Sequence, residues 1–119
     1  MTSNRKASMT SSDRRSGRDR RAAQRFRITV AVEYDAGNGR KPGTIADIND
    51  LGCFVLCDGD VRDGEAVQLY LPLTAGMKVP FPAEVTNHVY EIGFAARFIG
   101  LTEPQRDFLD SFIDIHRED

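Results

Sequence analysis

The 119-residue chain has few of the residues and runs on which many functions depend. It has no tryptophan, two cysteines and two histidines. No stretch approaches the ~20 apolar residues of a membrane-spanning helix. Residues Met1–Lys6 are not followed by an apolar run, so we expect no secretory signal and a cytoplasmic protein. At this length there is little room for a second core, and we expect one domain.

The scarcity of cysteine and histidine argues against a metal centre. Cys53 and Cys57 are four residues apart, which on a strand places them on one face but separated by more than ~10 Å. We therefore expect reduced, partly buried thiols that neither bridge nor share a metal. His88 and His116 have no evident catalytic partner, and no nucleophile, zinc-protease or phosphate-loop motif is present. The sequence favours a receptor without metal or cofactor over an enzyme.

Charge is divided unevenly along the chain. Residues 1–27 contain nine basic and two acidic residues, whereas the rest contains seven basic and 16 acidic residues. We expect residues 1–19, which have almost no bulky apolar side chains, to form a disordered basic arm before a single domain over residues 20–119. The charge suggests an anionic partner for this arm. The alternative is an arm that only solvates the chain or rests on its acidic surface.

The apolar pattern from Phe26 onward is typical of a mainly β protein. Residues 28–34 alternate between apolar and polar positions, which indicates a half-buried strand. Turn signals and further short apolar segments predict additional strands at Thr44–Ile48, Cys53–Cys57, Ala66–Leu71, Phe81–Asn87 and Gly93–Ile99. Pro80 and Pro82 predict an edge position or a late start for the strand near them. Short strands without intervening helices indicate an antiparallel sandwich or barrel.

One helix is predicted at the C-terminus. Thr102 and Gln105 have the spacing of a capping box, and Pro104 is tolerated in a first helical turn. The residues that follow place their apolar side chains on one face: Phe108, Leu109, Phe112, Ile113 and Ile115. A helix this short is unstable alone in water, so we expect it to pack on the sheet or on a partner.

Two motifs carry the strongest functional signal. The first is Arg21-x-x-x-Arg25, where the basic arm meets the first strand, and the second is Asp47-x-Asn49-x-x-Gly52, at a predicted turn. The planar guanidinium of arginine binds phosphates through parallel hydrogen bonds and also stacks on bases. A carboxylate beside turn amides suits the donor edge of guanine. Together these elements predict a site for a guanine nucleotide with more than one phosphate.

The two motifs, in this order and separation, resemble those of the PilZ domain family, bacterial receptors for cyclic di-GMP. The resemblance covers the chain from about Arg20 to the C-terminus. It implies a six-stranded antiparallel β-barrel with a C-terminal α-helix and a flexible N-terminal arm that becomes ordered on ligand binding. It also implies that Arg21 and Arg25 hold the ligand's phosphates and guanines, with Arg20 as a further contact. Asp47, Asn49 and Gly52 would form the guanine side of the site.

Asn49 departs from this pattern, because the family usually has serine there. An asparagine amide provides one acceptor and two donors, so it replaces some hydroxyl contacts, but it is bulkier. Losing one hydrogen bond costs about 1 kcal/mol and an unsatisfied group roughly 1–3 kcal/mol. Since about 1.4 kcal/mol is tenfold in affinity, we expect cyclic di-GMP binding weakened by about ten- to a hundredfold and not abolished.

We expect ordering of the arm to change a surface that a separate effector protein recognises. The family suggests flagellar, surface-attachment or polysaccharide machinery as that effector. One alternative is a PilZ-like adaptor that acts by protein contact without a ligand. A less favoured one is a nucleic-acid tether through the basic arm, because the body lacks an aromatic, basic face for stacking bases.

Overall fold

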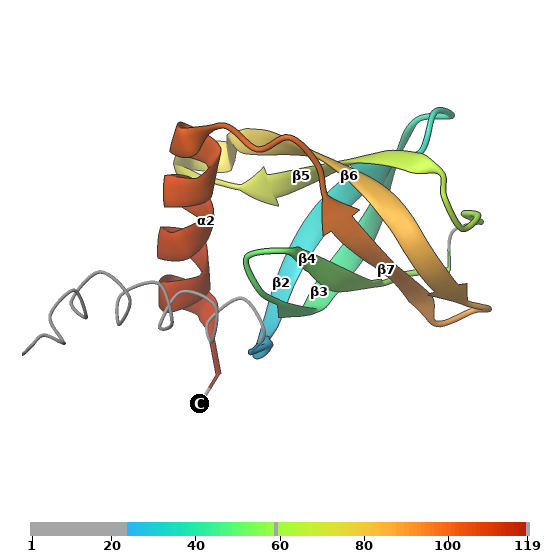
Figure 1. The fold of residues 1–119 in the computed structure, drawn as a ribbon, viewed down its shortest axis with the longest axis horizontal. Coiled ribbons are helices and arrows are strands. Elements are labelled where there is room, and N and C mark those ends of the chain that lie inside the picture. The colour runs from blue at the N-terminus through green and yellow to red at the C-terminus, as the bar shows by residue number, and fades with distance from the viewer. Residues whose placement is uncertain (1–23, 59, 119) are drawn as a thin grey trace, which may run out of the picture.

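The computed structural model of the protein describes residues 24–58 and 60–118. These residues form six antiparallel strands and a C-terminal helix (Figure 1). The strands are β2 (Phe26–Asp35), β3 (Arg40–Ile48), β4 (Gly52–Leu56), β5 (Ala66–Pro72), β6 (Lys78–Val89) and β7 (Gly93–Phe98), and a short 3-10 turn, η1 (Thr74–Gly76), joins β5 to β6. They close into a barrel in the order β2-β3-β4-β7-β6-β5. The predicted six-stranded barrel is confirmed.

The barrel interior is filled by the apolar half of each alternating strand. Along β2 the buried residues are Phe26, Ile28, Val30, Val32 and Tyr34, with more exposed residues between them. The ring of Tyr34 contacts that of Phe94 on β7 edge to face, with 5.3 Å between the ring centroids. Because successive side chains of a strand point to opposite faces, the intervening residues form the outer surface of the barrel.

Two strands begin earlier than the sequence pattern predicted. β3 begins at Arg40, whereas the apolar pattern indicated Thr44. β6 begins at Lys78, so the late start expected from the prolines is wrong. The edge position predicted for these prolines is correct in part. β7 pairs with β6 only from Ala83 onward, so the segment with Pro80 and Pro82 pairs with β5 alone. A proline lacks the N–H that a second neighbour would require.

The helix α2 (Glu103–His116) covers one end of the barrel (Figure 1). Its predicted capping box is present: Thr102 Oγ1 accepts a hydrogen bond from Gln105 N at 3.3 Å, and Gln105 Oε1 accepts one from Thr102 N at 2.8 Å. The buried residues of the helix are Leu109, Phe112 and Ile113. At the far end of the helix, Glu118 N donates to Arg27 O at 2.8 Å. The helix therefore packs on the barrel, as its length required, and its end lies beside the start of β2.

Two predictions from the sequence concern the N-terminal arm and membrane-spanning segments, not the barrel. The basic arm expected over residues 1–19 lies outside the described residues. Within residues 24–58 and 60–118, no helix has the length and apolar character to cross a membrane.

Candidate ligand-binding site

The start of β2 and the end of β3 bring the two sequence motifs together. Arg27 on β2 is paired with Asp47 on β3. Arg25, two residues before Arg27, points to the same side, and its Nε donates to Asp47 Oδ1 at 2.8 Å. The side chains of Arg25 and Asp47 are 47% and 37% exposed, so the contact lies on the surface. Residues 22 apart in sequence thus meet at one end of the barrel.

The surface around this ion pair is concave. An open hollow of about 480 Å³ is lined by Arg25, Arg27, Ile28, Thr29, Ala46 and Asp47. The hollow contains two guanidinium groups and one carboxylate. Arg20 and Arg21, the other predicted ligand contacts, lie outside the described residues.

Asn49 supports the turn between β3 and β4 from inside. The residue is only 3% exposed. Its Oδ1 accepts hydrogen bonds from Leu51 N at 2.9 Å and Gly52 N at 3.0 Å. Its own backbone N–H donates to Gly52 O at 2.9 Å. Asn49 therefore forms the side-chain turn that short polar residues favour, with its oxygen directed at the backbone.

Gly52 is required for close approach of two strands. A Cβ atom on this residue would lie 2.1 Å from Ala96 O on β7. The described glycines with positive φ do not include Gly52. A left-handed backbone conformation is therefore not the reason for glycine at this position. The second motif ends in glycine because β4 and β7 leave no space for a side chain there.

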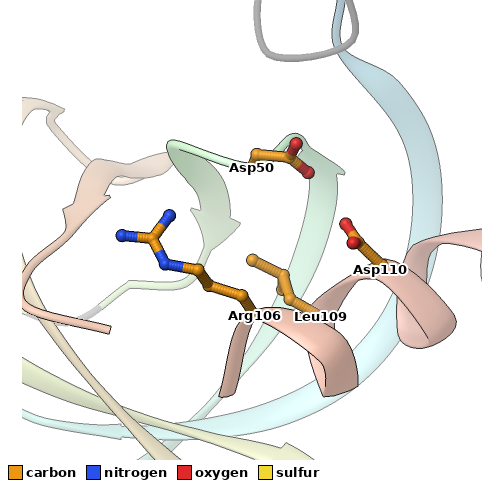
Figure 2. Close-up of a pocket in the computed structure, with 4 residues that line it drawn as sticks. All are labelled: Asp50, Arg106, Leu109 and Asp110. Atoms are coloured by element: carbon orange, nitrogen blue, oxygen red, sulfur yellow. The ribbon is translucent and has the colours of Figure 1, made fainter. Parts of the chain in front are cut away.

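The turn that carries the second motif also faces α2. Figure 2 shows Asp50 of this turn above a small hollow whose other lining residues, Arg106, Leu109 and Asp110, come from the helix. Leu109 is buried, and the side chain of Arg106 extends away from the two carboxylates. The turn that follows Asp47 is therefore adjacent to α2, so the candidate site and the helix are connected through this turn.

The two cysteines differ in burial. Cys53 and Cys57 are both free, the first buried and the second half-buried. Burial raises the pKa of the Cys53 thiol to about 12, with a smaller opposing effect from Arg25. Within residues 24–58 and 60–118 there is no group of three or more acidic, histidine or cysteine side chains that could hold a metal ion.

Sequence reasoning did not identify two outward side chains near these motifs. Phe54 on β4 is paired with Asp47, and Arg97 on β7 is paired with Gly52. The continuous apolar run of β4 does not show which of its residues face outward. The sequence also does not show which residues of different strands are neighbours, because strand order and register are properties of the whole barrel.

Comparisons with known proteins agree with this fold. The family model for the PilZ domain matches residues 19–114. Among solved structures, the chain is similar to the PlzA protein of Borreliella burgdorferi, crystallised in complex with c-di-GMP, with a TM-score of 0.63 and 9% sequence identity. The similarity covers 84% of this chain and 43% of the PlzA chain, so this chain spans less than half the length of that relative. A search of curated protein sequences finds no match.

Proposed function

This chain belongs to the PilZ domain family, and from that membership we propose that it binds cyclic di-GMP as a non-catalytic receptor. The observation that carries the proposal is the contact of Arg25 with Asp47, which joins the two motifs in one concave surface. The fold similarity to a protein crystallised with c-di-GMP supports the same ligand. The proposed ligand contacts are Arg20, Arg21 and Arg25 on the arginine side and Asp47 with the turn Asn49–Gly52 on the other.

The ion pair between Arg25 and Asp47 is compatible with an accessible ligand site. An exposed pair of this kind contributes about 0–1 kcal/mol, so a ligand can compete for either partner at low cost. Arginine has five N–H donors, and the contact of Arg25 with Asp47 uses the one on Nε. The remaining donors suit phosphate oxygens, and the carboxylate of Asp47 suits the N–H groups of a guanine.

The role proposed for Asn49 follows from its buried oxygen. Because Oδ1 accepts from two backbone N–H groups, Asn49 contributes by holding the turn beside Asp47. In this interpretation asparagine in place of serine preserves the shape of the turn. The asparagine therefore does not indicate that ligand binding has been lost. The absence of a serine hydroxyl contact to the ligand still predicts weakened binding.

We propose that output requires a separate effector protein. Ligand binding would order the basic arm of residues 1–19 beside the start of β2, where the end of α2 also lies. The surface at this end of the barrel, next to α2, would then differ between the free and bound states. An effector in motility, attachment or polysaccharide machinery would recognise one of these states in the cytoplasm. The alternative is an adaptor that binds its partner without any nucleotide.

Isothermal titration calorimetry tests the ligand. We expect cyclic di-GMP to bind with micromolar affinity, at about two ligands per chain, whereas GTP and a cyclic adenine dinucleotide bind much more weakly. Arg25→Ala should weaken binding at least tenfold because a charged hydrogen bond contributes about 1.5–3 kcal/mol. Arg40→Ala is a matched control, because Arg40 also pairs with an acidic residue, Glu33, at 3.4 Å.

The same titration separates the alternatives. Absence of binding at high ligand concentration would contradict the receptor proposal and favour the adaptor. Equal affinity of the Arg25→Ala variant and the wild type would mean that the site lies elsewhere. Binding of single-stranded oligonucleotides with steep salt dependence would favour a nucleic-acid tether.

A further inference from the structure

The outer surface of β4 carries an aromatic ring beside the candidate site. Cys53 and Val55 on this strand are fully buried, so the alternation of the strand directs Phe54 outward. Phe54 is half-buried, which leaves part of its ring on the surface. Its cross-strand partners are Asp47 on β3 and Ala95 on β7. An aromatic side chain is therefore adjacent to the carboxylate of the second motif.

A third guanidinium lies on the next strand. Ala96 and Phe98 of β7 are buried, so Arg97 points outward. Its side chain is 63% exposed, and its Nη2 donates to Glu84 Oε1 on β6 at 2.8 Å. Arg97 is paired with Gly52, the last residue of the second motif. Because β7 separates β6 from β4, this contact directs the guanidinium toward β6, and it is an exposed pair of the kind that contributes about 0–1 kcal/mol.

These residues lie on three successive strands beside the site already described. Neighbouring strands are about 4.8 Å apart, so the backbone of β7 lies about 10 Å from that of β3, with β4 between them. That distance is comparable with the length of a nucleotide. Across these strands the outer surface presents the carboxylate of Asp47 and the ring of Phe54, followed diagonally by the side chain of Arg97, two residues beyond Ala95, the partner of Phe54.

We propose that Phe54 and Arg97 extend the ligand site across β4 to β7 and recognise one guanine base of the ligand. The ring of Phe54 stacks on the face of the base. The fork of Arg97, released from its exposed contact with Glu84, donates to the guanine O6 and N7 acceptors, the edge that arginine binds with two parallel hydrogen bonds. Adenine has a donor in place of O6, so Arg97 selects guanine. This inference rests on the proposed cyclic di-GMP binding.

The test compares variants of the full chain by calorimetry with cyclic di-GMP and a cyclic adenine dinucleotide. Phe54→Leu keeps an apolar side chain but removes the flat ring, and we expect about tenfold weaker binding, because stacking on an aromatic side chain contributes about 1–3 kcal/mol per base. Arg97→Ala and Arg97→Lys should both weaken cyclic di-GMP binding and reduce its preference over the adenine dinucleotide, since lysine keeps the charge but lacks the fork.

Matched controls come from the same barrel. Leu56→Ala changes an outward apolar residue at the other end of β4, 42% exposed. Arg40→Ala removes an exposed arginine that pairs with a glutamate, as Arg97 does, but on β3. Both controls should bind as the wild type does. Thermal unfolding of each variant verifies that its fold is intact.

The outcomes distinguish this inference from the proposed function. Absence of cyclic di-GMP binding by the wild type would overturn both. Wild-type binding that Arg25→Ala weakens, but Phe54→Leu and both Arg97 variants leave unchanged, would overturn only the extension of the site. Full recovery of affinity and guanine preference by Arg97→Lys would show a charge contact and overturn the recognition of the guanine edge.

Discussion

At the scale of single residues, the turn after β3 shows how one side chain fixes a local shape. Asn49 is buried, and its oxygen accepts hydrogen bonds from the backbone of Leu51 and Gly52. Gly52 then passes so close to Ala96 O that no side chain fits. Asp47, the partner of Arg25, lies two residues before Asn49, so the position of its carboxylate depends on this turn.

Replacing Asn49 should therefore destabilise the fold. Asn49→Ala removes the acceptor of two N–H groups that are buried or partly buried, and we expect a loss of about 1–3 kcal/mol in the free energy of unfolding. Asn49→Ser retains an acceptor oxygen, so its loss should be smaller. Urea unfolding measures both variants. Asn38→Ala, in the exposed turn after β2, is the control and should change stability by about 0.5 kcal/mol or less. A wild-type midpoint for Asn49→Ala would refute the role of the side chain in the turn.

At the scale of elements, α2 depends on the barrel for its stability. The capping box satisfies backbone groups at its start, but 14 residues form only a marginal helix in water. Its buried face contacts the aromatic core, where the rings of Phe81 and Phe108 are 5.7 Å apart. Ile115, which the sequence pattern placed with these apolar residues, is 75% exposed, so that part of the predicted apolar face is wrong. The buried face and the exposed side of the helix should therefore respond differently to substitution.

Truncating one side chain from each face tests this difference. Phe112 is 3% exposed, so Phe112→Ala should reduce the free energy of unfolding by about 3–5 kcal/mol through lost burial and the cavity that remains. Ile115→Ala should change it by about 0.5 kcal/mol or less. Denaturant unfolding followed by far-ultraviolet circular dichroism gives both values. Similar losses for the two variants would show that the exposed face of α2 also packs in solution.

At the scale of the whole molecule, closure of the barrel decides where the motifs lie. β2 pairs with β3 along one side and with β5 on the other, through Glu33, Tyr34 and Asp35. Closure leaves the start of β2, the end of β3 and the end of α2 together at one end of the barrel (Figure 1). The hairpin between β6 and β7 is separated from that end. A ligand held by both motifs should therefore act on one part of the surface.

Hydrogen exchange locates this part. With saturating cyclic di-GMP, we expect slower amide exchange in residues 25–29 and 47–54, because a ligand between Arg25 and the turn restricts local opening of both segments. Residues 89–93, in the β6–β7 hairpin, should exchange at the same rate with and without ligand. GTP at the same concentration is the control and should change neither region. Protection of the hairpin instead of the β2 start would place the ligand elsewhere on the barrel.

The sequence by itself determined the local elements, because the signals for them are local. Alternation along β2 gave its inward residues, and Thr102 with Gln105 gave the start of α2. The boundaries of β3 and β6 were less predictable, because pairing with a neighbour extends a strand beyond its apolar residues. The two motifs gave the candidate site, of which the structure describes Arg25, Asp47, Asn49 and Gly52.

Only the tertiary structure decided how these parts meet. The contact of Arg25 with Asp47, the reason for glycine at position 52 and the neighbours of Phe54 all depend on strand order and register. Register is set by closing the barrel around a common core, so it involves every strand at once. The burial of Asn49 likewise follows from packing around the turn. The sequence showed which chemical groups each motif contains. Which side chains and backbone atoms those groups contact was decided by the closed barrel.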